Sequence, residues 1–286
     1  MKLKFATFLS KLILILKRPD MNILPGHLAF FFVLSLIPIL TLITFFATIF
    51  NIPVHELSTS IGNLPNGIVE ILVPAYTDTS ITFGNIIIVL ISFFVASNGA
   101  DAVILTSNKL YNIKQSSIVQ RRVKSIIVTV IFIGLFLFML LIPVFGNIII
   151  ELISNIVNDS IYKSIKIIYN ILQLPITLLF VYFNIKIIYT IAPDKNIKSK
   201  EVSSGAFFTT ISWVVISQIY SYYINNFANY SRIYGNLSNL VILMLFIYLL
   251  SNIFVIGMAL NAYKNELDDE INKTARINII KSLHNI

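Results

Sequence analysis

Hydrophobic residues in this chain gather into six long runs, which short polar or charged segments separate. A helix needs about 20 residues to cross the hydrocarbon of a bilayer, and the runs are close to that length. We expect membrane-spanning helices at about residues 27–50, 83–106, 125–142, 167–191, 202–225 and 237–262. The pattern therefore predicts an all-α integral membrane protein, with a six-span membrane domain over residues 25–263.

The first 20 residues show a different pattern, that of an amphipathic helix. Lys4, Lys11 and Arg18 follow one another at intervals of seven. The apolar residues Phe5, Phe8, Leu9, Leu12, Ile13 and Leu16 recur at helical spacing and share another face. Such a helix is typical of the headgroup region, where its bases face anionic lipid. A short cytoplasmic helix packed on the bundle would show the same pattern.

The remaining amphipathic and charged segments lie outside the six runs. We expect two further interfacial helices between the first two spans, at Val54–Leu64 and Asn66–Val73. Residues 264–286 form a charged tail, which we place in the cytoplasm together with residues 1–20.

The distribution of basic residues predicts the orientation of the spans. Of the 21 Lys and Arg, 17 fall in residues 1–26, 107–124, 193–201 and 263–286, and three fall in the alternate connections. Basic residues collect in cytoplasmic loops of membrane proteins. Both termini are therefore predicted to be cytoplasmic.

One acidic residue, Asp101, falls at the end of the second apolar run. An ionisable group on a membrane helix is costly and commonly functional, so Asp101 is a candidate proton or cation site. The alternative is an interface residue that pairs with Lys109 or with an arginine of the following loop. Counting 20 residues from Phe83 places the hydrocarbon edge near Ala102, which puts Asp101 within one turn of that edge.

Other polar residues within the runs are candidates for a polar cavity or substrate path. They are Ser97, Asn98, Gln173 and Asn252, together with Asp101. Interhelical hydrogen bonds, which are common between membrane helices, are the alternative use for such side chains.

Two prolines, Pro38 and Pro175, interrupt the first and fourth runs and predict helix kinks. These runs cross in opposite directions, as broken helices do in transporters built from inverted repeats. Two unrelated kinks would give the same pattern.

Composition argues against several kinds of chemistry. The chain has no Cys, and its three His, His27, His55 and His284, are far apart. We therefore expect no metal site and no catalytic centre, and no nucleotide-binding fingerprint indicates a cofactor. The basic loop at 107–124 favours anionic lipid headgroups as partners rather than nucleic acid.

Several segments in order resemble one known family. They are HLAFFFVLSLIPIL (27–40), ASNGADAVILTSNKLYNI (96–113) with the double Arg at 121–122, YTIAPDKNIKSKEVSSGAFFTTISW (189–213) and NYSRIYGNLSNLVILMLFIYLLSNIFVIGMALNAY (229–263). Together they resemble the YihY/virulence factor BrkB family. The resemblance implies a multi-pass protein of the bacterial inner membrane, in a family once labelled ribonuclease BN and linked in some members to envelope lipid traffic.

The functional prediction rests on that resemblance and on the polar residues within the spans. It is an inner-membrane protein that moves or handles an amphipathic envelope component, such as a lipid or a lipid precursor. The alternative is a non-transporting scaffold that binds partner proteins or anionic lipid. A ribonuclease ranks third, because no set of metal ligands supports it. The sequence does not specify an oligomeric state.

Overall fold

The computed structural model describes residues 10, 12–49, 83–135, 158–226, 230 and 234–284, and within them every regular element is a helix, as predicted. Residues 118–135 form one of these helices. The others are η1 (Pro19–Asn22), α2 (Leu24–Ile49), α5 (Phe83–Leu110), α7 (Asp159–Ile191), α8 (Ser203–Asn226), η2 (Gly235–Leu237) and α10 (Ser238–His284).

Four segments in the described part of the chain are long and apolar enough to cross a membrane. They are Pro19–Ile39, Ile86–Leu110, Ile161–Ile191 and Leu240–Lys264, and they overlap the first, second, fourth and sixth predicted spans.

Other predicted segments are not tested in this way. The expected third span begins in the helix at 118–135 and continues outside the described residues. Residues 1–9 and the two expected interfacial helices before α5 also lie outside the described residues. In place of the fifth span, α8 forms a long helix that is not among the four apolar segments. Six crossings therefore stay a prediction.

Two helices extend well beyond the apolar runs that predicted them. α7 begins at Asp159 rather than near residue 167, and α10 continues to His284 rather than ending near residue 262. Neither extension contains Pro or Gly, the residues that most strongly interrupt helices. Apolar content decides which part of a helix suits the membrane, but it does not decide where the helix ends.

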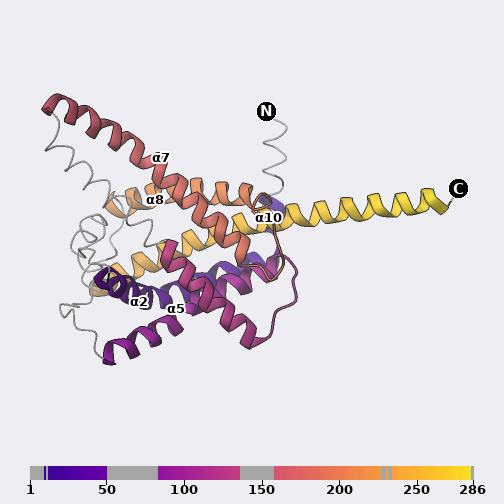
Figure 1. Ribbon diagram of the computed structural model, residues 1–286, viewed down its shortest axis with the longest axis horizontal. Helices are drawn as coiled ribbons and strands as arrows, with labels where there is room; N and C mark the ends of the chain where they lie inside the picture. Colours follow the sequence, from indigo (N-terminus) through magenta and orange to yellow (C-terminus); the bar gives the residue numbers. More distant parts are fainter. Residues whose placement is uncertain are drawn as a thin grey trace.

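α2 and α5 pack along each other, and α10 contacts both α8 and α2 (Figure 1). At the α2–α5 crossing, Ser35 of α2 lies against Gly99 of α5. A Cβ added at Gly99 would lie 2.9 Å from the Ser35 hydroxyl oxygen, so a side chain there would require Ser35 to shift.

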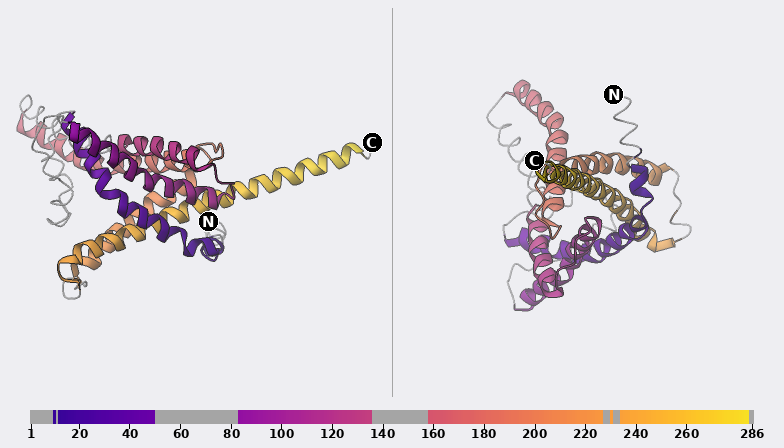
Figure 2. Two further views of the ribbon diagram at one scale, coloured as in Figure 1. Left: turned by 90° about the horizontal axis from the view of Figure 1, so that it is seen from below. Right: turned by 90° about the vertical axis from the view of Figure 1, so that its right-hand side faces the viewer.

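The C-terminal part of α10 extends away from the bundle (Figure 2).

α8 and α10 approach still more closely, at Gly205 and Gly257. A Cβ at Gly257 would collide with the Thr209 hydroxyl, and one at Gly205 with the Gly257 carbonyl. Small residues allow such backbone approach in membranes. Asn261 of α10 completes the contact, since its Oδ1 accepts from the Gly205 amide at 2.8 Å and its Nδ2 donates to the Val202 carbonyl at 3.2 Å.

A buried cluster lies beside this contact and joins α7 to α8 and α10. The Tyr189 hydroxyl of α7 donates to the Phe254 carbonyl at 2.6 Å and lies 2.8 Å from the Thr209 hydroxyl. Tyr189, Phe254 and Met258 are all fully buried side chains. The hydroxyl thus has partners in a core that would otherwise leave it unsatisfied.

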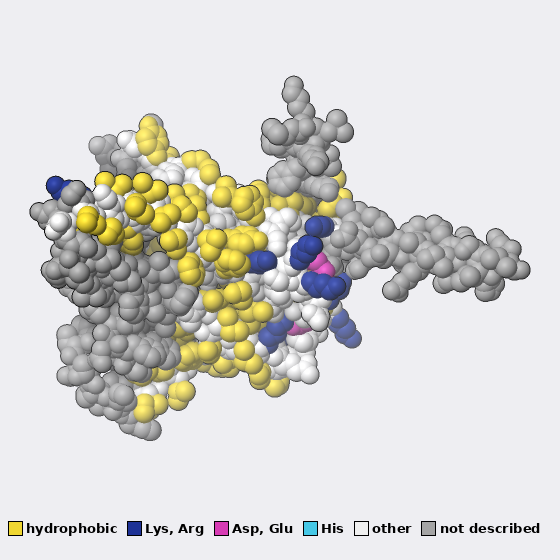
Figure 3. Space-filling view, turned by 45° about the horizontal axis from the view of Figure 1, so that its top comes forward, with side chains coloured by type: hydrophobic (Ala, Val, Ile, Leu, Met, Phe, Trp, Pro, Cys, Tyr) yellow, Lys and Arg dark blue, Asp and Glu magenta, His cyan; other side chains and the backbone are white. Residues whose placement is uncertain are grey.

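Large apolar side chains also cover the outside of the bundle. On α7, Ile167, Ile171 and Leu174 are all exposed. Figure 3 shows hydrophobic side chains over much of the described surface, with most Lys and Arg near the end from which α10 projects. An exposed apolar surface of this extent is what contact with lipid requires.

The close α8–α10 contact predicts a sharp response to Gly257→Ala. The added methyl group meets Thr209 and Tyr189, and overpacking of this kind costs about 1–3 kcal/mol. We expect a lower thermal unfolding midpoint in detergent, measured by circular dichroism. Gly134→Ala is the matched control, because a Cβ there meets nothing within 4 Å. Equal midpoints for the two variants would contradict the packing described above.

Candidate functional site

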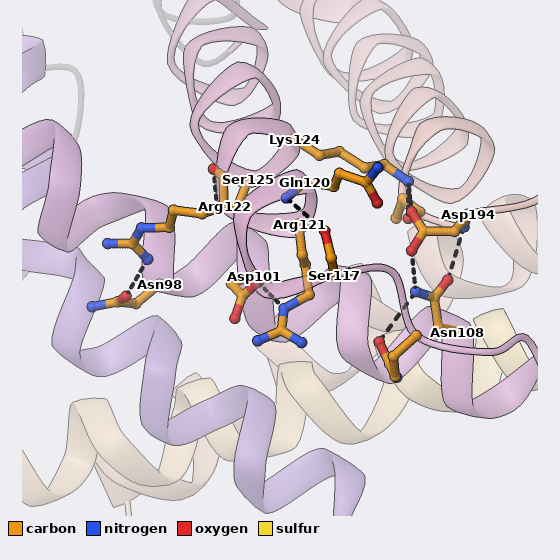
Figure 4. A network of polar contacts seen from close by, with 12 residues as sticks. Asn98, Asp101, Asn108, Ser117, Gln120, Arg121, Arg122, Lys124, Ser125 and Asp194 are labelled. Carbon is orange, nitrogen blue, oxygen red and sulfur yellow. Dashed lines mark hydrogen bonds and ion pairs between the residues drawn. The ribbon is translucent and has the colours of Figure 1, made fainter.

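The helix at 118–135 carries three basic residues near its start, and each of them binds different partners. Ser117 precedes it, and the Ser117 hydroxyl lies 3.4 Å from the Gln120 amide, in the position of an N-cap. Arg121, Arg122 and Lys124 then point toward α5 and the loop after α7, as Figure 4 shows. This network is the candidate functional site.

Arg121 forms an ion pair with Asp101. The Arg121 Nε donates to the Asp101 Oδ1 at 2.8 Å, and each side chain is 21% exposed. Lys109, the other partner considered for Asp101, lies 3.7 Å from Asp20 instead. Asp101 is therefore held by an arginine that follows the loop. On α5, Asp101 lies eight residues, or about 12 Å, before Lys109.

Arg122 reaches further along α5, away from Lys109. Its Nη1 donates to the Asn98 Oδ1 at 2.8 Å, and its Nη2 donates to the Phe94 carbonyl at 2.9 Å. The guanidinium carbon lies 3.8 Å from the centre of the Phe94 ring, a cation–π contact. Asn98 and Asp101 are thus parts of one row of polar groups on α5, each bound by an arginine.

Lys124 and Asn108 together fix the loop after α7. The Lys124 Nζ donates to the Ala192 carbonyl at 2.8 Å, the Pro193 carbonyl at 2.9 Å and the Asp194 Oδ1 at 2.6 Å. Asn108 accepts from the Asp194 amide at 2.8 Å and donates to its Oδ2 at 2.7 Å. Three segments distant in sequence, at 108, 124 and 192–194, therefore meet at one point.

This environment shifts the pKa of the Asp194 carboxyl. Burial alone would raise the pKa, but the hydrogen bonds from Lys124 and Asn108 and the Lys124 charge outweigh it, so the pKa lies below its ordinary value. Asp194 is thus held in its charged form by its neighbours.

Ser97 meets the arginine network only through a shared acceptor, the Phe94 carbonyl, to which Arg122 also donates. Ser97 is buried, and its hydroxyl donates to the Phe94 carbonyl of its own helix at 2.8 Å.

Gln173 and Asn252 lie on other helices. The backbone carbonyl of Gln173 in α7 accepts from the Thr177 hydroxyl, and the Asn252 side chain of α10 donates to the backbone carbonyl of Tyr248, each at 2.8 Å. Among the described residues, no hydrogen bond or ion pair joins Gln173 or Asn252 to Asn98 or Asp101. The two prolines, Pro38 and Pro175, lie inside α2 and α7, and each helix continues on both sides.

The sequence pattern did not reveal the roles of Asn108, Lys124 and Asp194. Lys124 is one of several basic residues in its loop, and Asn is too common in this chain for one residue to be distinctive. A usable signal was Asp194, an acid that directly follows an apolar run in a loop otherwise rich in Lys. Within the described ranges, no three His, Cys, Asp or Glu residues lie together as metal ligands would.

Comparison with known proteins identifies the family. The model of the family described as Virulence factor BrkB matches residues 15–277. The chain belongs to this family. This BrkB-family protein is accordingly a membrane protein, in keeping with its several apolar helices.

Individual relatives resemble the BrkB-family chain over different lengths. It is 30% identical over 258 residues to the ribonuclease-like protein YfkH of Bacillus subtilis. The aligned region covers 86% of this chain and 91% of the relative. A UPF0761 membrane protein of Haemophilus influenzae strain PittEE is 32% identical over 93 residues, covering 32% and 35%. No solved structure matches.

The lowered pKa of Asp194 predicts how its contribution to stability depends on pH. A carboxyl whose pKa is depressed on folding stabilises the protein above its unfolded pKa of about 3.9 and loses that contribution as pH falls through the folded value. Asp194→Asn should lower the thermal midpoint equally at pH 7 and pH 5, and the difference from wild type should shrink below about pH 4.

The control for this measurement is Asp20→Asn, because Asp20 is more exposed and faces Lys109 at 3.7 Å. Exposed pairs contribute about 0–1 kcal/mol, so a small effect is expected. A loss in Asp194→Asn that grew toward low pH would contradict the assignment.

Proposed function

We propose that this BrkB-family protein crosses the bacterial inner membrane six times, with both termini in the cytoplasm. α8, the helix at the fifth predicted span, has 24 residues, or about 36 Å at the helical rise. It packs against both α7 and α10. The basic loop at 107–124 and the basic segment at 193–201 meet through Lys124 and Asp194, which supports a location on the same side of the membrane.

The absence of Cys in the whole sequence makes this topology directly testable. Single Cys residues at Asn66, Lys114 and Lys198 need no background mutations. In intact cells whose outer membrane has been permeabilised, a membrane-impermeant maleimide should label Asn66→Cys. Lys114→Cys and Lys198→Cys should react only after the inner membrane is opened. Labelling of Lys114→Cys in cells with an intact inner membrane would overturn the orientation.

We propose that the protein moves or handles an amphipathic envelope component, such as a lipid or a lipid precursor. The observation that carries the proposal is the arginine-bound polar row at Asn98 and Asp101, which is partly exposed and continues directly into exposed apolar side chains of α5. A molecule with a polar head and an apolar chain matches such a surface. Ser97, Gln173 and Asn252 stay candidates for other parts of a path, and Pro38 and Pro175 for its kinked helices.

The alternative is a scaffold that transports nothing, and one feature of α10 favours it. α10 continues about 20 residues beyond Lys264, where its apolar segment ends. At the helical rise this part is about 30 Å long. A helix of that length beyond the membrane is suited to binding a partner protein.

Lipid analysis of a deletion strain tests the proposed function. Deletion should change the envelope lipid profile, and the wild-type gene should restore it. Asp101→Asn and Pro175→Ala should restore it only in part, whereas Lys114→Gln, which removes an exposed loop charge, should restore it fully. An unchanged profile in the deletion strain would count against lipid handling.

Truncation after Lys264 separates the two candidates. If the membrane domain handles lipid by itself, the truncated chain should restore the lipid profile of the deletion strain. If the truncated chain accumulates normally in the membrane and restores nothing, the C-terminal part of α10 carries the function and the scaffold is favoured.

A further inference from the structure

We propose that Arg121 and Arg122 form a binding site for the phosphate of an anionic lipid, with one of its acyl chains lying along α5. The site deepens the proposed function and rests on it, because it names the part of the amphipathic molecule that the protein recognises. Three features of the described residues support this site: unused hydrogen-bond donors, a net positive charge, and an apolar stripe that begins at Phe94.

The donors of the three basic residues are used to different extents. Lys124 has three N–H donors and binds three oxygens, so its ammonium is saturated. The Arg121 guanidinium has five N–H groups, and among the described residues it donates only through Nε, to Asp101. Its terminal nitrogens therefore remain for a further acceptor, and a guanidinium fork suits a phosphate.

The charges of the cluster favour an anion. Two guanidinium groups face a single carboxylate, since the partner of Arg122 is the neutral Asn98. The cluster thus keeps a net charge of one positive unit. Asn98 and Asp101 lie three residues apart on α5 and are neighbours on one helix face, so the two arginines bring their positive charges to the same face of α5 (Figure 4).

An apolar stripe continues from this polar pair along the same face of α5. The residues Ile87, Leu90, Ile91, Phe94, Asn98 and Asp101 follow helical spacing. The four apolar members are exposed, Phe94 by 58%. The stripe from Ile87 to Phe94 is about 10 Å long. It offers an acyl chain a contact that a free phosphate ion cannot use, and this favours a lipid as the occupant.

Binding to the purified full-length protein in detergent tests the site. Native mass spectrometry would compare phosphatidylglycerol, phosphatidylcholine and inorganic phosphate. Phosphatidylglycerol should bind more tightly than phosphatidylcholine. Phosphate at millimolar concentration should displace little of it, because phosphate lacks the chain. Full displacement by phosphate, or equal binding of the two lipids, would overturn the proposal.

Two substitutions should shift phosphatidylglycerol binding in opposite directions. Arg122→Gln removes one guanidinium and should weaken binding about tenfold. Asp101→Asn keeps an acceptor for Arg121 but removes the competing negative charge, so binding should tighten by about threefold or more. Lys114→Gln removes one exposed basic charge from the same loop and is the matched control, with binding near wild type.

The outcomes distinguish this site from the proposed function. Equal losses in Arg122→Gln and Lys114→Gln, with thermal midpoints unchanged, would overturn the site and leave lipid handling to be judged by the deletion strain. If Arg122→Gln does not fold, weaker or unchanged binding in folded Asp101→Asn overturns the site by itself. Tighter binding in Asp101→Asn beside an unchanged lipid profile in the deletion strain would support the site and reject the wider function.

Discussion

The cost of placing charge in an apolar environment governs the arrangement of this protein. Burial removes the water that would stabilise an ionised group, so a buried charge needs a partner. The partly buried ionised groups of the candidate site are accordingly held by fixed partners: Asp101 by Arg121, and Asp194 by Lys124. Because those partners come from other segments, satisfying the charges also brings α5, the helix at 118–135 and the loop after α7 together.

Close packing between helices is the second organising contact, and it works differently. α8 and α10 meet where glycine lets backbone approach backbone, and Asn261 supplies partners for polar groups at the start of α8. Lipid does not drive apolar helices together as water does, so packing and hydrogen bonds carry helix association. Tyr189 extends the same contact to α7.

Much of the fold could be predicted from the pattern of apolar runs, because a helix of given length is what the bilayer requires. α5 begins at Phe83 as predicted, and α2 and α8 lie close to their predicted bounds. The extensions of α7 and α10 could not be read from hydropathy, since polar residues also form helices. The polar pairs were harder still. The sequence pointed to Asp101 and to two possible ion-pair partners for it, Lys109 or an arginine of the following loop. Which of them binds Asp101 depends on how the helix at 118–135 crosses α5. The contact among Asn108, Lys124 and Asp194 includes two residues more than 80 positions apart along the chain, Asn108 and Asp194. No local sequence pattern predicts it.

The length of α10 has a mechanical consequence. No proline interrupts the 47 residues of this helix, so its membrane part and its C-terminal part form one continuous helix. That helix packs closely against α8 at Gly257. A tilt of about 10° at that contact would sweep the far tip through at least about 5 Å, given the roughly 30 Å of helix that continues beyond Lys264. A small tilt among the packed helices therefore becomes a larger displacement at the C-terminus. A force applied to the C-terminus is likewise transmitted to the packed helices.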